Sequence, residues 1–204
     1  MKLNTSNIWF TSDTHYNHTN ICRGVSKWDT KSVQTRDFPD LEHMNSTLVN
    51  NINSCVGQDD ILFHLGDWSF GGIENIAAFR NRIICREVHL ILGNHDHHIK
   101  RNKENTQDLF ASVSRILDLE VVTPEFRRNF MLHHFPVISW EDMSHGVIHL
   151  HGHIHLPKRL RLRDGKSMDV GVDGNDLMPH HIKDIVKIMD KQPIAKSTLP
   201  FDHH

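Results

Sequence analysis

Five short clusters of polar side chains interrupt the sequence, and each follows directly after an apolar run. The residue types in them are carboxylate, amide and imidazole, which can bind metal ions or move protons. An apolar run that ends in such a cluster is typical of a buried strand ending at an open sheet edge, where catalytic residues tend to lie. The clusters are Asp13 with His15, Asp67, Asn94 with His95, His134, and His153 with His155.

The spacing inside these clusters favours metal binding. Residues two apart in an extended segment face the same side, so the D-x-H pair is expected to reach one ion and the H-x-H pair to converge on a metal centre. The mixture of nitrogen and oxygen ligands suits divalent Mn, Fe, Zn or Ni and disfavours Ca²⁺. Seven such ligands are too many for one ion but suit two, provided that one carboxylate bridges them. The chain also contains 19 His, more than a purely structural role requires.

Alternating strands and helices are predicted to position these clusters. The predicted strands span residues 8–12, 60–65, 88–92, 119–122, 129–134, 146–150 and 168–173, and the predicted helices span 39–53, 73–84, 103–117 and 182–189. Strands and helices alternate early, and strands dominate later, which favours a layered α/β domain with mixed sheets. We expect one domain over residues 1–192 and a loose tail over 193–204, whose closing His203 and His204 are given no function.

The composition excludes several classes of protein. The net charge of −2 gives no global attraction to nucleic acid or membrane, although the basic stretch 158–163 could be a local nucleic-acid contact or simply a solvated hairpin. Three Cys without a C-x-x-C motif argue against a disulfide framework. No apolar stretch is long enough to span a bilayer. We therefore expect a cytoplasmic protein that does not bind membranes, and the sequence leaves its oligomeric state open.

In this order the clusters resemble the calcineurin-like metallophosphoesterase superfamily. The sequence contains its D-x-H, G-D, G-N-H-D, H and G-H-x-H blocks in order over most of the chain. They are Asp13-Thr14-His15, Gly66-Asp67, Gly93-Asn94-His95-Asp96, His134 before Phe135-Pro136, and Gly152-His153-Ile154-His155. The stretches Leu65–Gly71, Val170–Asp173 and Arg36–Phe38 look like those of small bacterial and phage members, which lack large cap domains.

The resemblance implies a fold and a set of ligands. The fold would be an αββα sandwich of two mixed β-sheets flanked by helices. The first metal would be held by Asp13, His15 and His155, the second by Asn94, His134 and His153, and Asp67 would bridge the two. Because neighbouring strand residues face opposite ways, only one of His133 and His134 should face the site. The family pattern favours His134, the residue just before aromatic-Pro, and His133 remains the alternative.

The resemblance also implies a reaction. His95 would lie beside the phosphoryl group as general acid, and Asp96 would orient it. Two metals would activate a bridging hydroxide as the nucleophile while His95 protonates the departing oxygen. Arg23 or Arg36 could grip the phosphate, and His18 is a further candidate for substrate binding.

The first hypothesis is a phosphodiesterase that acts on nucleotides or nucleic-acid ends, with two divalent ions as cofactors. A phosphomonoesterase or protein phosphatase is the second. The non-enzyme alternative is a protein-interaction module braced by metal. A structural metal site is normally closed by four ligands on one ion, whereas these ligands come from five separate strand ends.

Overall fold

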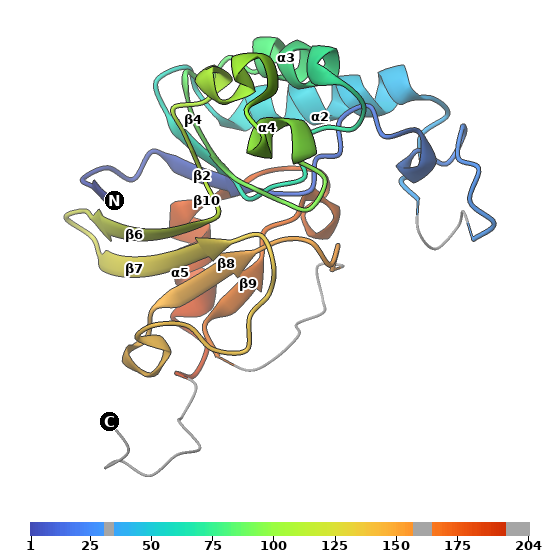
Figure 1. Cartoon of the computed structure of the whole chain (residues 1–204). Coiled ribbons are helices and arrows are strands. Elements are labelled where there is room, and N and C mark those ends of the chain that lie inside the picture. Colours follow the sequence, from blue (N-terminus) through green and yellow to red (C-terminus); the bar gives the residue numbers. More distant parts are fainter. Residues whose placement is uncertain (31–34, 157–164, 195–204) are drawn as a thin grey trace.

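The computed structural model describes residues 1–30, 35–156 and 165–194. Two five-stranded sheets lie face to face at its centre (Figure 1). Sheet 1 has the strand order β10 (His180–His181), β2 (Ile8–Thr11), β3 (Ile61–His64), β4 (Glu87–Ile91) and β5 (Ser112–Ser114). Sheet 2 has the order β1 (Lys2–Leu3), β6 (Ile116–Val122), β7 (Arg127–His133), β8 (Ile148–His151) and β9 (Ser167–Asp169).

Both sheets are mixed, but in different ways. In sheet 1, β2, β3, β4 and β5 run parallel, and only the edge strand β10 is antiparallel. In sheet 2, the long β6–β7 pair is antiparallel, and the remaining pairs are parallel. The strands β2, β3 and β4 of sheet 1 therefore all end at the same edge, as do β7 and β8 of sheet 2.

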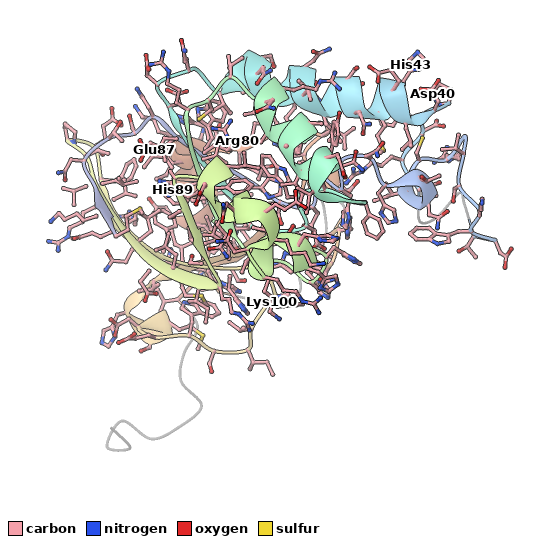
Figure 2. The ribbon with its side chains drawn as sticks, turned by 45° about the horizontal axis from the view of Figure 1, so that its top comes forward. Asp40, His43, Arg80, Glu87, His89 and Lys100 are labelled. Atoms are coloured by element: carbon pink, nitrogen blue, oxygen red, sulfur yellow. The ribbon has the colours of Figure 1, made fainter. Side chains whose placement is uncertain are left out.

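The helices are α2 (Leu41–Cys55), α3 (Ile73–Arg82), α4 (His97–Lys100) and α5 (Ile182–Met189). Short 3-10 turns lie at η1 (Thr19–Ile21), η2 (Lys103–Leu109), η3 (Met143–His145) and η4 (Val172–Gly174). The start of α2 is capped by Asp40, whose side chain accepts a hydrogen bond from the His43 N–H at 2.9 Å (Figure 2). The helix therefore begins after Pro39-Asp40, two residues later than the sequence predicts.

Helices and sheets enclose two main apolar layers. Between the sheets, Phe10 and Phe63 stack at 5.4 Å and meet Phe130 from sheet 2. The apolar face of α5, which carries Ile182 and Ile185, joins this layer. The outer face of sheet 1 is covered by α2 and α3 (Figure 1).

The outer face of sheet 2 is more polar. Side chains alternate along its strands, so the inward residues are Leu119, Val121 and Phe130, whereas Asp118 and Asn129 point outward and are exposed. The predicted fold class of two mixed sheets flanked by helices is confirmed, with α2 and α3 on sheet 1.

The predicted helix over residues 103–117 is wrong. Its apolar positions have helical spacing, yet the segment forms η2, then β5, then the start of β6. Val113 pairs with Leu90 in sheet 1, and Ile116 begins an antiparallel ladder that continues to Val122. β-Branched residues at these positions fit a pleated sheet, so strand pairing prevailed over helical periodicity.

One further prediction differs from the structure, and two others fall on residues that the structure does not describe. The late strand is shorter than predicted, because β9 ends at Asp169 and η4 follows. The basic stretch 158–163 lies outside the described residues, as does most of the predicted tail. Within the described part of the chain, no helix is both long and apolar enough to cross a membrane.

Candidate metal centre

The predicted ligands lie at the ends of five strands. Asp13 follows β2, Asp67 follows β3 and Asn94 follows β4, all at one edge of sheet 1. From sheet 2, His134 follows β7, and the H-x-H pair follows β8. Hydrogen bonds join the two edges: the Gly152 N–H donates to the His134 carbonyl at 2.9 Å, and the His153 N–H donates to the Asp13 carboxylate.

Most ligand residues have a left-handed backbone. The φ angles are 57° at Asp13, 46° at His15, 56° at Asp67, 73° at His153 and 50° at His155. Such a conformation costs on the order of 1–3 kcal/mol per non-glycine residue and persists only where the surroundings hold it. Tight turns therefore present the D-x-H and H-x-H pairs. The extended geometry that we predicted for them is wrong: Asp13 and His15 reach one candidate metal position, whereas His153 and His155 reach two different ones.

Two groups of donor atoms result. The first ligand group is Asp13, His15 and His155, and the second is Asp67, His134 and His153. Within each group one donor atom per residue lies within 4.8 Å of the others. Asn94 adjoins the second group, because its Oδ1 lies 3.0 Å from His134 Nε2.

Asp67 lies between the two groups. Its Oδ2 is 3.6 Å from His15 Nε2 and 3.5 Å from His134 Nε2. Its Oδ1 instead accepts a hydrogen bond from the His95 N–H at 2.8 Å. One oxygen of this carboxylate is therefore fixed by the loop after β4, and the other faces a ligand from each group.

These residues fit divalent ions. Imidazole and carboxylate donors lie about 2.0–2.2 Å from an ion such as Zn²⁺, so two ligands of one ion are at most about 4.4 Å apart. Two pairs within the groups lie inside that limit, His134 Nε2 with Asp67 Oδ2 at 3.5 Å and His155 Nε2 with Asp13 Oδ1 at 3.9 Å. Burial raises the pKa of Asp13 to about 7, so its carboxylate lacks full compensation from the protein alone. Two cations would supply the missing positive charge.

The electrostatics of Asp67 differ from those of Asp13. Burial acts to raise the pKa of Asp67, but hydrogen bonding and charge from His134, together with His15, outweigh burial and hold that pKa below its usual value. Burial lowers the pKa of His15 well below that of free imidazole. Asp67 is therefore ionised and His15 is neutral at neutral pH, and these are the protonation states that bind metal.

The structure distinguishes the two histidines after β7. His134 is fully buried, and its Nδ1 donates to the Leu65 carbonyl at 2.7 Å, which leaves Nε2 facing Asp67 and Asn94. His133 Nδ1 lies 3.1 Å from the Phe135 carbonyl, and its side chain is on the opposite face of the strand. His134 is therefore the candidate ligand of the pair.

His95 and Asp96 are neighbours in the sequence, but the first side chain is exposed and the second is buried. His95 is exposed, and its ring lies 5.4 Å from that of His15 and 5.0 Å from that of Phe70. The prediction that Asp96 orients this imidazole is wrong. Asp96 is buried, and its carboxylate accepts hydrogen bonds of 2.8–3.0 Å from backbone N–H groups. These donors belong to Gly93, Asp67 and Trp68, so Asp96 ties the loop after β4 to the loop after β3.

Of the three predicted substrate-binding residues, two are paired with carboxylates and one lies near the ligands. Arg36 is buried and its guanidinium bonds to Asp173 and to backbone carbonyls, so the prediction that it grips phosphate is wrong. Arg23 pairs with Asp37 at 2.8 Å. His18 lies near the ligands: its ring is 5.4 Å from that of His15 and stacks on Phe70 at 3.7 Å.

Sequence reasoning missed three residues that support the ligands or the loops that carry them. Asp173 accepts a hydrogen bond from His155 Nδ1 at 2.6 Å, and only its place after a Gly-containing strand hinted at a role. His64 accepts from the Gly66 N–H, so its Nε2 donates to Thr14 Oγ1 at 2.8 Å. Thr14 in turn donates to the Trp68 carbonyl, which links the loops that carry the first two clusters.

Relatives of this chain are found among curated sequences, although no protein-family model matches it. The chain is 30% identical over 193 residues to the Gene 66 protein of Mycobacterium phage L5, across 82% of this chain and 87% of that protein. It is 29% identical over 203 residues to an uncharacterized protein of Methanocaldococcus jannaschii, across 93% and 95% of the two chains.

Among solved structures, a protein of unknown function from Aquifex aeolicus superposes with a TM-score of 0.61 at 20% identity. The match covers 89% of this chain and 98% of that one. The two chains therefore share a fold. A nuclease of Pseudomonas putida gives a TM-score of 0.40, which is too low to indicate a common fold.

Proposed function

The chain belongs to the same family as the Gene 66 protein of Mycobacterium phage L5, and we propose that it is a metal-dependent phosphoesterase with two divalent ions. The observation that best supports this proposal is the position of Asp67, whose Oδ2 lies 3.6 Å from one ligand group and 3.5 Å from the other. A carboxylate that faces both groups suits a pair of ions better than two independent sites.

The proposed roles of the residues follow from their geometry. Asp13, His15 and His155 hold the first ion, and the second ligand group with Asn94 holds the second. Asp67 would be the ligand shared by the two sites. The ions, when bound, would supply an activated water and polarise the phosphoryl oxygens of a bound ester.

His95 is proposed as the general acid. Its imidazole is exposed beside His15, so it can reach the oxygen that leaves the phosphorus and protonate it. Its backbone N–H is held by Asp67, so the residue that bridges the ligand groups also fixes the main chain of the acid. His95 needs no metal of its own for this role.

A phosphodiesterase acting on nucleotides or nucleic-acid ends is the favoured substrate class. Aromatic rings line one side of the centre: His18 lies flat on Phe70, and Trp28 meets His18 edge-on at 5.9 Å. Half-buried aromatic rings near a phosphoryl site offer a stacking surface for a base. Exposed cations follow on and after α4, among them Lys100 (Figure 2) and Arg101.

Activity on two model esters tests the reaction class. Protein loaded with Mn²⁺ should hydrolyse bis-p-nitrophenyl phosphate faster than p-nitrophenyl phosphate. The opposite order would favour a phosphomonoesterase or protein phosphatase. No turnover of either ester by metal-loaded protein would favour an interaction module braced by metal.

A second pair of esters tests the nucleotide preference. The p-nitrophenyl ester of thymidine 5′-monophosphate and methyl p-nitrophenyl phosphate share a diester and a leaving group, but only the first carries a base. Phe70→Leu should raise KM for the thymidine ester and leave KM for the methyl ester unchanged. Loss of one stacking contact corresponds to about 1–3 kcal/mol, or roughly 5–150-fold. An equal change for both esters would argue against a base-stacking role.

A further inference from the structure

Arg36 is an unusual arginine for a loop, because nearly all of its side chain is buried and committed to the protein. Its side chain is 5% exposed. Nη2 donates to the Asp13 carbonyl at 2.6 Å, and Nη1 donates to the Thr14 carbonyl at 2.7 Å. The guanidinium therefore holds the backbone of the turn that presents Asp13 and His15, both of which have left-handed φ angles.

The same guanidinium also holds a carboxylate. Nε donates to Asp173 Oδ1 at 2.7 Å, and Nη2 donates to Asp173 Oδ2 at 2.9 Å. This bidentate pairing fixes the plane of the carboxylate as well as its distance. Asp173 and Arg36 are 137 residues apart in the sequence, so the pair joins the loop before α2 to the turn η4.

Asp173 in turn sets the orientation of His155. Because an ionised carboxylate can only accept, the 2.6 Å contact to His155 Nδ1 means that Nδ1 carries the proton. Nε2, the nitrogen left to bind metal, faces Asp13 Oδ1 at 3.9 Å, across the candidate position of the first ion. A carboxylate on the outer nitrogen of a ligating histidine fixes both its tautomer and its ring orientation.

We propose that Arg36 and Asp173 are positioning residues for the first metal, acting together on all three of its ligands. Arg36 fixes the turn of Asp13 and His15, and Asp173 fixes His155. This inference rests on the proposed metal centre, but it does not depend on which reaction the centre catalyses. The bidentate pairing with Asp173 replaces the phosphate-binding role that the sequence had suggested for Arg36.

The second ligand group provides an internal comparison. Its buried histidine, His134, donates to the Leu65 carbonyl, a backbone group that Arg36 and Asp173 do not contact in the described residues. Asp67 accepts from the His95 N–H, and Asn94 lies beside His134. Removing the Arg36–Asp173 pair should therefore weaken the first metal and spare the second.

Equilibrium Mn²⁺ binding, measured by calorimetry, tests the proposal with Asp173→Asn. We expect two binding events in the wild type and, in the variant, one of them weakened by about 10–100-fold, the usual cost of losing an outer-shell partner. The other event should keep its affinity. The rise in melting temperature on adding Mn²⁺ should shrink in parallel, and neither readout requires turnover.

A second variant guards against misfolding, because Asp173→Asn alone leaves the buried Arg36 cation unpaired. The double variant Arg36→Gln with Asp173→Asn removes both charges and should show the same selective loss. The matched control is Asp190→Asn, which removes the carboxylate of another Arg–Asp pair, where Arg128 Nη2 donates at 2.9 Å on the surface. It should leave both binding events unchanged.

Three results would overturn the proposal: two unchanged binding events in a folded variant, equal weakening of both events, or a wild type that binds no Mn²⁺. A wild type that binds two ions but hydrolyses no phosphoester would instead count against the proposed function alone. In that case, a selective loss in Asp173→Asn would still support the positioning role.

Discussion

The two sheets contribute different chemistry to the one centre. Sheet 1 supplies the candidate oxygen ligands, which are Asp13, Asp67 and Asn94, from three parallel strands that end at the same edge. Sheet 2 supplies only imidazoles, from the ends of β7 and β8. Within the two ligand groups, His15 is the one imidazole that comes from sheet 1. Neither sheet alone presents a complete ligand group, so metal binding would require the two edges to be held together.

The way in which the ligands are held differs as well. On sheet 1, the turns bond to each other through the backbone: Asp13 N–H donates to the Gly66 carbonyl, and His15 N–H donates to the Asp67 carbonyl, both at 3.0 Å. On sheet 2, the turn after β8 depends on sheet 1, because His153 N–H donates to the Asp13 carboxylate at 2.9 Å. The Asp13 carboxylate is therefore both a candidate ligand and an anchor for sheet 2.

The largest effect should follow from removing the carboxylate that faces both ligand groups. Asp67→Asn should weaken both metals, each by more than the roughly 10–100-fold cost of an outer-shell change, and should abolish activity on every substrate. Elemental analysis of the purified protein measures the loss. Asp60→Asn is the control, because Asp60 lies just before β3 and bonds to Trp9, at the opposite end of the strand. One tightly held ion that Asp67→Asn leaves unchanged would rule out a two-metal centre.

The next effect separates proton transfer from metal binding. His95→Ala should keep both metals, because His95 lies outside both ligand groups. Loss of a general acid costs about 10²–10⁴ in rate, most for alkoxide leaving groups and least for p-nitrophenolate, which departs readily as an anion. His153→Ala, which removes a ligand from sheet 2, should lose metal and activity together on all substrates. Equal losses for good and poor leaving groups in His95→Ala would contradict the acid role.

The strand-end ligands could be predicted because they depend on local pattern. An apolar run followed by a polar cluster marks the end of a buried strand, and parallel strands bring such ends to one edge. Strand alternation indicates that only one of His133 and His134 faces the centre, and the family pattern, not the alternation, selects His134. These signals lie within a few residues of each ligand.

The supporting contacts could not be predicted, because they depend on residues far apart in the sequence. Arginine is a residue type that often binds phosphate, but the partner of Arg36 is Asp173, which is 137 residues away. Asp96 follows His95 directly, yet its carboxylate bonds to backbone groups of Asp67 and Trp68. The left-handed φ angles at the ligands are a further case: Asp and His adopt this conformation more readily than most residues, but residue type alone does not say which of them will do so.

A smaller effect is expected at the contact between the sheets. A Cβ placed on Gly152, in the turn after β8, would overlap Ser12 Oγ and the Asp13 carboxylate. Gly152→Ala should therefore displace Asp13 and weaken the first metal, with overpacking that costs about 1–3 kcal/mol of unfolding free energy. Chemical denaturation and Mn²⁺ titration measure the two effects. Gly57→Ala is the control, since its nearest neighbour, Asp60 Oδ2, would be 3.4 Å away. An unchanged Mn²⁺ affinity in Gly152→Ala would show that the turn after β8 can shift without displacing Asp13.

The smallest effect concerns an imidazole of sheet 2 that belongs to neither ligand group. His149 is fully buried: its Nδ1 donates to the Met131 carbonyl at 3.2 Å, and its Nε2 accepts from the Val137 N–H at 3.3 Å. Burial lowers the pKa of His149 to about 4, against an ordinary value of 6.5. The folded protein therefore keeps this ring neutral over a range of pH in which the unfolded chain protonates it.

The sign of the pH dependence follows from that difference. Between pH 6.5 and about 4 the unfolded state binds more protons at His149, so the free energy of unfolding falls as pH falls, by at most about 1.4 kcal/mol per pH unit from this group. In chelator, His149→Gln should show a shallower decline over that range than the wild type, because the contribution of the metal ligands is common to both and cancels. The control is His97→Gln, which removes an exposed imidazole on α4 and should follow the wild-type curve. Parallel curves for His149→Gln and the wild type would mean that this ring is not held neutral in the folded protein.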